Sequence, residues 1–160
     1  MKVGFIGTGA MGRPMARNLV SKGFTVAAFD LQPAALAAAV QAGASAADSA
    51  AAAAAASDLV VTMLPSSSHV ERAYFGPGGV VEGLAPGRLC VDMSTIDPAT
   101  ARRVAARLVE RGARFTPPAM HARGITEART VERLHRLDNL PAHRRGGGMI
   151  QIHGLWHKSI

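Results

Sequence analysis

The chain has 160 residues, 48% of them hydrophobic, which is enough for one domain with a real core. Cys90 is its only cysteine, which excludes an internal disulfide, and we expect a buried structural thiol in a reducing compartment. The net charge of +7 is uneven, since residues 1–113 carry ten basic against eight acidic residues and residues 114–160 carry eight against three.

The first expected element is a short apolar strand over residues 3–7, which leads into a turn with glycines at positions 7, 9 and 12. This G-x-G-x-x-G spacing is typical of dinucleotide binding when it follows a strand and opens a helix. Gly7 lets the chain turn, Gly9 lets the backbone approach a pyrophosphate, and Gly12 lets the helix pack close to the sheet. A helical pattern follows from Met11, and the N-terminus of that helix favours an anion.

A second apolar strand over residues 25–29 ends in Asp30, eighteen residues after the last of these glycines. A carboxylate at this strand end can accept both hydroxyls of an adenosine ribose, and it repels the extra phosphate of NADP. Because Leu31 and Gln32 offer no cation for that phosphate, the sequence favours NAD over NADP. An alternative is that Asp30 caps the helix that begins at Pro33.

The rest of the chain up to residue 115 continues this alternation of strands and helices. In chain order we expect a short strand near Ala44, an Ala-rich helix from Ala50, a strand over 59–64, a helix capped by Ser66, a turn over 76–79, a strand over 88–92, a helix over 99–111 and a strand near Arg114. This order predicts an α/β fold, a Rossmann-type doubly wound parallel sheet with strand order 3-2-1-4-5-6. The apolar run over 50–64 is shorter than the roughly 20 residues of a membrane helix, so we expect no membrane partner.

Four segments carry a family resemblance: residues 3–19, 62–65, 73–79 and 92–98. They resemble the amino-terminal domain of the β-hydroxyacid dehydrogenases, which include 6-phosphogluconate dehydrogenase, and most closely the 3-hydroxyisobutyrate dehydrogenase branch. The resemblance implies a dinucleotide-binding domain over residues 1–115, with NAD as the cofactor and NADP less favoured.

The resemblance also implies which residues contact the cofactor. The glycine loop would hold the pyrophosphate, Asp30 the adenosine ribose, and Thr95 the nicotinamide end. Leu64 and Pro65 would lie at the ribose on the nicotinamide side, and His69 stands where relatives carry a polar residue that reaches the cofactor. The full set is Gly7, Thr8, Gly9, Ala10, Met11, Gly12, Asp30, Leu64, Pro65, His69 and Thr95. An alternative for Thr95 is a cap of the next helix.

The activity that the resemblance implies is NAD-dependent oxidation of a small-molecule 3-hydroxy acid. In the branch named, this is the conversion of 3-hydroxyisobutyrate to methylmalonate semialdehyde in valine catabolism. A homo-oligomer is an expected assembly. We expect a cytoplasmic location, or the mitochondrial matrix in a eukaryote, although no Arg-rich presequence precedes the first strand. The alternatives are another β-hydroxyacid dehydrogenase, such as tartronate semialdehyde reductase, and a non-catalytic NAD(P)-binding module.

After Phe115 the resemblance ends. The family continues with a loop that binds the substrate carboxylate and with an all-helical second domain that carries the catalytic lysine, and residues 116–160 match neither. Lys158 has no matching surroundings, so we assign no catalytic residue to this chain. We therefore expect a truncated chain that lacks the second domain and is a poor catalyst alone.

Residues 116–160 form a basic, histidine-rich segment that we expect to be a disordered tail. A short helix over 126–137 is its one periodic stretch. An alternative function for residues 123–145 is nucleic-acid binding, which we disfavour as a partner and which would show as an affinity that falls steeply with salt. We also disfavour a metal site at His153 and His157, because no further ligand is evident.

Overall fold

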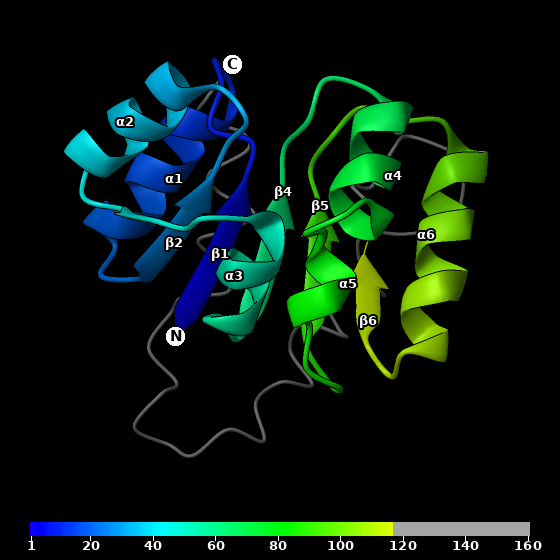
Figure 1. The fold of residues 1–160 in the computed structure, drawn as a ribbon. Coiled ribbons are helices and arrows are strands. Elements are labelled where there is room, and N and C mark those ends of the chain that lie inside the picture. Colours follow the sequence, from blue (N-terminus) through cyan, green and yellow to red (C-terminus); the bar gives the residue numbers. More distant parts are fainter. Residues whose placement is uncertain (117–160) are drawn as a thin grey trace. The chain divides into compact units, whose positions relative to one another are not determined.

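The computed structural model describes residues 1–116 of the chain (Figure 1). Residues 117–160 lie outside the described residues. The predictions of a disordered tail, of a short helix over 126–137 and of no metal site at His153 and His157 are therefore not tested by the structure. Everything below concerns residues 1–116.

Six parallel strands form one sheet in the order β3-β2-β1-β4-β5-β6. The strands are β1 Lys2–Ile6, β2 Thr25–Phe29, β3 Ser45–Ala46, β4 Leu59–Thr62, β5 Leu89–Asp92 and β6 Arg114–Thr116. The chain starts at the middle of the sheet, runs outward to β3, returns to β4 beside β1, and runs outward again to β6. This order confirms the predicted doubly wound sheet, because the crossover from β3 returns to the middle, where β4 pairs with β1, and the later crossovers build the sheet outward on the other side.

Six helices cover the two faces of the sheet (Figure 1). They are α1 Gly12–Ser21, α2 Pro33–Gln41, α3 Ala50–Ala55, α4 Ser67–Phe75, α5 Val80–Gly83 and α6 Pro98–Glu110. Neighbouring side chains of β1 point to opposite faces: Phe5 lies near Gly12 of α1, whereas Ile6 belongs to a core cluster with side chains of α3 to α6. The helices α1 and α2 therefore share one face, and α3 to α6 share the other. No helix of residues 1–116 is both long and apolar enough to cross a membrane.

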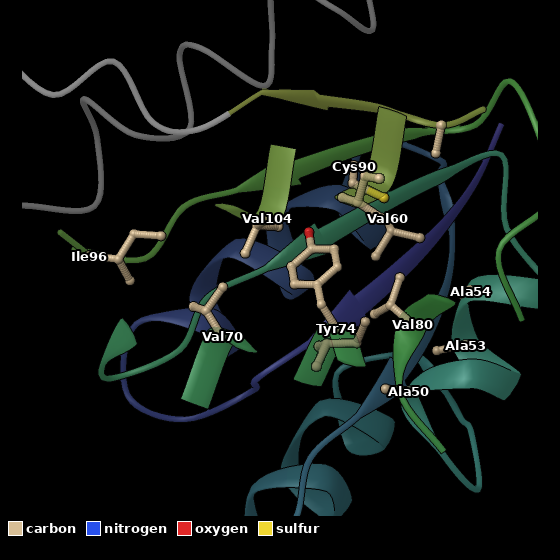
Figure 2. Close-up of a cluster of buried hydrophobic side chains, with 13 residues drawn as sticks. Ala50, Ala53, Ala54, Val60, Val70, Tyr74, Val80, Cys90, Ile96 and Val104 are labelled. Carbon is tan, nitrogen blue, oxygen red and sulfur yellow. The ribbon is translucent and has the colours of Figure 1, made fainter. Parts of the chain in front are cut away.

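The larger core lies between the sheet and α3 to α6, and it centres on Tyr74 of α4. Figure 2 shows the ring of Tyr74 among Val70, Val80 and Val104, and all four side chains are fully buried. Cys90 of β5 belongs to the same cluster, which confirms the expected buried thiol. Its burial raises the pKa of the thiol to about 12, so Cys90 is an inert apolar core residue near neutral pH.

Candidate functional site

Four connecting segments leave the carboxyl edge of the sheet side by side. The register pairs Ile6 with both Phe29 and Thr62, and it pairs Thr62 with Asp92, so β1, β2, β4 and β5 end at the same level. The segments that follow are residues 7–12, 30–32, 63–66 and 93–97. All the predicted cofactor residues lie in these segments, except His69, which lies in the first turn of α4. Ligands of open parallel sheets bind at this edge, so the topology gathers the predicted set at one site.

The loop between β1 and α1 needs glycine at two of the three glycine positions of its G-x-G-x-x-G motif. Gly7 has a φ of +91°, a conformation that other residues rarely adopt. A Cβ on Gly12 would overlap the carbonyl oxygen of Gly7, so the start of α1 packs directly on the turn. Gly9 is different, because it is exposed and no atom lies within 4 Å of the position that a Cβ would take. The outer side of the loop at Gly9 is therefore open.

The N-terminus of α1 has no side-chain cap. Met11 occupies the N-cap position without a side-chain hydrogen bond to the helix, and the first turn holds no acidic residue. Ala10 and Met11 are exposed, and 46% of Met11 is open to solvent. The N–H groups of a first helical turn have no partner within the helix, and together with the helix dipole they favour an anion. This end of α1 can therefore hold a phosphate group.

Asp30 ties the glycine loop to the end of β2. Its Oδ2 accepts a hydrogen bond from the N–H of Thr8 at 2.6 Å, and the Thr8 hydroxyl lies 3.3 Å from the same oxygen. Its Oδ1 accepts from the N–H of Gln32 at 2.8 Å. The N-cap residue of α2 is Gln32, with no side-chain cap, so the alternative that Asp30 caps this helix is wrong. Two carboxylate oxygens offer about four acceptor sites, and Asp30 therefore keeps capacity for a further donor.

The segment after β4 presents Leu64, which is half-buried, and Pro65, which is exposed. His69 is also exposed, and its Nδ1 lies 2.7 Å from the hydroxyl oxygen of Ser66. The predicted serine cap is correct in position, because Ser66 is the N-cap residue of α4, but wrong in detail. The Ser66 hydroxyl contacts His69 and Ser68 and makes no side-chain hydrogen bond to the helix backbone.

Thr95, in the segment after β5, is exposed. The cap of α6 is Asp97, whose Oδ1 accepts from the N–H of Thr100 at 2.8 Å. The alternative that Thr95 caps this helix is therefore wrong, and its side chain is available to a ligand. Hydrogen bonds from the hydroxyls of Thr100 and Ser67 hold the pKa of Asp97 well below its usual range.

Beneath these segments lies a buried polar network to which the sequence analysis gave no role. Asp92 is fully buried at the end of β5, and its Oδ1 accepts from the hydroxyls of Thr62 at 2.8 Å and Ser94 at 2.6 Å. The Ser94 hydroxyl oxygen in turn accepts from the N–H of Leu64 at 2.8 Å. The sequence does carry a signal for this network, because a polar residue ends each of two otherwise apolar strands. These residues are Thr62 at the end of β4 and Asp92 at the end of β5.

Comparison with known proteins gives one matching family over most of the described residues. Residues 2–117 match the model of the NAD binding domain of 6-phosphogluconate dehydrogenase. The chain is 46% identical over 112 residues to 2-(hydroxymethyl)glutarate dehydrogenase of Eubacterium barkeri, covering 70% of this chain. It is 46% identical over 111 residues to NAD-dependent L-serine dehydrogenase of Pseudomonas aeruginosa, covering 69%. The chain spans 37% of the length of each of these two relatives.

Solved structures give the same picture. A structure of 3-hydroxyisobutyrate dehydrogenase of Mycobacterium tuberculosis with L-serine aligns at a TM-score of 0.69 and 37% identity, over 72% of this chain and 39% of that one. A structure described as Psf3 in complex with NADP⁺ and 2-OPP aligns at 0.67 and 30% identity, over 71% and 40%. The similarity therefore covers the described sheet and helices. One of the two similar structures contains NADP⁺.

Proposed function

The chain belongs to the family of the NAD binding domain of 6-phosphogluconate dehydrogenase, and on this premise we propose that the carboxyl edge of its sheet is the NAD site of a hydroxyacid dehydrogenase. The observation that carries the proposal is the common level at which β1, β2, β4 and β5 end. It brings the open glycine loop, Asp30 and the exposed Thr95 to one edge. The pyrophosphate lies at the uncapped start of α1, where backbone N–H groups meet it.

Asp30 selects the cofactor in this proposal. Its remaining acceptor capacity meets the hydroxyls of the adenosine ribose, and its charge repels the 2′-phosphate of NADP. Leu31 follows it, 70% exposed and apolar, and gives that phosphate no cation. NAD is therefore the proposed cofactor. The other half of the cofactor extends across β4 and β5, past Leu64, Pro65 and His69 to Thr95.

The proposed substrate class is a small 3-hydroxy acid. The segments 62–65 and 92–98, which flank the nicotinamide end, resemble the 3-hydroxyisobutyrate dehydrogenase branch, so we propose oxidation of 3-hydroxyisobutyrate to methylmalonate semialdehyde, a step of valine catabolism. Serine and 2-(hydroxymethyl)glutarate carry the same hydroxymethyl group and are named as substrates of two relatives. Oxidation transfers a hydride to the nicotinamide and a proton to a base.

In this proposal residues 1–116 bind the nicotinamide cofactor, which accepts the hydride. They place no lysine at that site to accept the proton. Their two lysines are Lys2, at the start of β1, and Lys22, just after the end of α1. Both lie toward the amino edge of the sheet, because α1 runs back from the carboxyl edge. We therefore propose that residues 1–116 bind and orient the cofactor. A non-catalytic NAD-binding module is the second candidate, and the same feature favours it.

Calorimetric titration of the full chain with NAD and with NADP tests the cofactor site. We expect NAD to bind more tightly. Asp30→Ala should weaken NAD binding by roughly 1.5–3 kcal/mol, because a charge-assisted hydrogen bond is lost. The variant also frees Thr8, which should weaken both cofactors, so the ratio of the two affinities is what reports on the ribose.

The control for this titration is Glu110→Gln, which removes one negative charge at the last residue of α6, far from the carboxyl edge. It should leave both affinities unchanged. A folded chain that binds neither cofactor would contradict the proposal, and an unchanged NAD-to-NADP ratio in Asp30→Ala would contradict the role of Asp30. NADH formation with 3-hydroxyisobutyrate or L-serine separates the dehydrogenase from the binding module.

A further inference from the structure

Asp92 breaks the pattern of the strand that it closes. The three residues before it, Leu89, Cys90 and Val91, are buried and apolar, and Asp92 is buried as completely as Cys90. Its Oδ1 takes part in three hydrogen bonds, from the Thr62 hydroxyl and from the hydroxyl and N–H of Ser94. Its Oδ2 is buried without a partner among residues 1–116. Burial of a carboxyl group without a cation is costly, and here it raises the pKa of Asp92. A rule broken in this way is expected at functional sites.

The hydrogen bonds of Asp92 fix the direction of the Ser94 hydroxyl. A serine hydroxyl has one proton to donate, and Ser94 gives it to Asp92. Its lone pairs are then free to accept, and the N–H of Leu64 donates to them at 2.8 Å. Without the carboxyl group, the Ser94 hydroxyl can rotate, and nothing then holds its lone pairs toward Leu64. The direction of the bond from Leu64 therefore depends on Asp92, with which Leu64 itself shares no hydrogen bond.

The hydrogen bonds from Leu64 to Ser94 and from Ser94 to Asp92 form a relay. This relay joins the two segments that flank the proposed nicotinamide end. Leu64 belongs to the segment after β4, and Ser94 directly precedes Thr95 in the segment after β5. The backbone adds one further link, from the N–H of Met93 to the carbonyl of Thr62 at 2.8 Å, but this link lies at the strand ends themselves. A second tie joins Ser67, at the start of α4, to Asp97, with the Ser67 hydroxyl 2.7 Å from Oδ2 of Asp97. The bond from Leu64 to Ser94 lies between these two links and is the one next to Leu64 and Thr95 themselves.

We propose that Asp92 is a positioning residue, which acts through Ser94 to hold the Leu64 and Thr95 segments at the spacing that the cofactor requires. This inference rests on the proposed NAD site. It assigns to Asp92 no contact with the cofactor, because the carboxyl group is fully buried beneath the loops. The role of Asp92 also differs from that of Thr62, because the Thr62 hydroxyl bonds to the same carboxyl oxygen but makes no hydrogen bond to either loop.

The test compares variants of the full chain in a double-mutant cycle. Asp92→Ala and Ser94→Ala should each weaken NAD binding about fivefold, the usual effect of one hydrogen bond, and the double variant should be no weaker than the worse single one. Asp92→Asn keeps an acceptor oxygen and should restore most of the affinity. Thr62→Val is the matched control, since it removes a bond to Asp92 and leaves the relay, and its NAD affinity should stay within about twofold of the wild type.

A second measurement follows the relay without the cofactor. Hydrogen exchange of the Leu64 amide should be faster in Asp92→Ala and Ser94→Ala than in Thr62→Val, and near the wild-type rate in Asp92→Asn. Variants that are less stable to urea but bind NAD as the wild type does would show a merely structural role and overturn the proposal. Additive losses of affinity would overturn it as well. If the wild type binds no NAD, the proposed function fails, and the amide exchange still decides whether the relay exists.

Discussion

Gly9 and Gly12 lie three residues apart in one loop, yet their surroundings are opposite. A Cβ on Gly12 would overlap the backbone of Gly7, whereas a Cβ on Gly9 would point into open space. Gly9 also has no positive φ, so alanine fits its backbone. Folding therefore requires the glycine at position 12, and the proposed cofactor site requires the one at position 9.

Paired alanine variants separate the two requirements. Gly12→Ala should lower the free energy of unfolding by more than about 1 kcal/mol, because the backbone must move to admit the methyl group. Gly9→Ala should change it by less than about 0.5 kcal/mol. In the proposed site, Gly9→Ala should still weaken NAD binding by about 1–3 kcal/mol, since the methyl group occupies the space of the pyrophosphate. Urea unfolding and calorimetry measure the two effects, and a Gly9→Ala variant with normal NAD affinity would place the pyrophosphate elsewhere.

The buried carboxyl group of Asp92 predicts a pH dependence of stability. Burial raises its pKa in the folded protein, while hydrogen bonds from Ser94 and Thr62 oppose the shift. A raised folded-state pKa means that the folded protein binds the proton more tightly, so this contribution to stability is full below the ordinary aspartate pKa of about 3.9 and is lost as the pH rises through the raised value. Its ionisable neighbours Tyr74 and Cys90 have pKa values raised by burial, so neither titrates in that range.

Asp92→Asn isolates this effect. The amide keeps the shape and cannot ionise, so the stability of the variant relative to the wild type should increase as the pH rises from about 4 toward neutrality. Urea unfolding of both proteins at several pH values gives the difference. A constant difference would show that Asp92 ionises normally in the folded protein.

At the level of single residues, the sequence predicted the parts of the site that follow local rules. The glycine spacing and the acid after β2 follow from the chemistry of a strand, a turn and a helix, and the structure places both at one edge. The relay from Asp92 through Ser94 to Leu64 could not be predicted in this way. It depends on the register between β4 and β5, which brings together residues 30 positions apart in the chain.

The secondary-structure elements show where local signals suffice. Strands β1, β2, β4 and β5 are apolar except for one residue at an end of each, as expected of buried parallel strands, and their positions were predicted to within about two residues. The helix α5 was missed, because its four residues are too few to carry a helical period. The cap of α4 was misjudged, because a serine at the N-cap position can bond to neighbouring side chains as readily as to the backbone.

Two helices have a serine at the N-cap position, and only one of these serines bonds to its helix backbone. Ser49 caps α3, and its hydroxyl accepts from the N–H of Ala52 at 3.0 Å. Ser49→Ala should therefore lower the free energy of unfolding by about 1 kcal/mol, the usual cost of a lost cap. Ser66→Ala should cost less, since the Ser66 hydroxyl makes no hydrogen bond to the backbone of α4. Urea unfolding measures both, and equal losses would mean that the hydroxyl of Ser66 caps its helix in solution.

For the described part of the molecule as a whole, the strand order followed from the sequence because parallel crossovers permit few arrangements. The packing partners inside the core did not follow. Tyr74 of α4 packs against the sheet with its ring 5.8 Å from that of Phe115 in β6, edge to face, and its hydroxyl lies 3.4 Å from that of Thr62 in β4. One side chain thus links a helix to two strands, and only the assembled fold shows it.

The ring of Tyr74, rather than its hydroxyl, should carry this link. Tyr74→Ala removes a fully buried ring and should cost about 3–5 kcal/mol, a large share of the 5–15 kcal/mol by which domains are stable. Tyr74→Phe keeps the ring and loses one long hydrogen bond, while Thr62 retains its bond to Asp92, so the cost should be about 1 kcal/mol or less. Urea unfolding followed by circular dichroism gives both values. If Tyr74→Phe lowered the free energy of unfolding as much as Tyr74→Ala does, the hydroxyl would be the essential group. The hydrogen-bond network of Thr62 and Asp92 would then include Tyr74 as a stabilising residue.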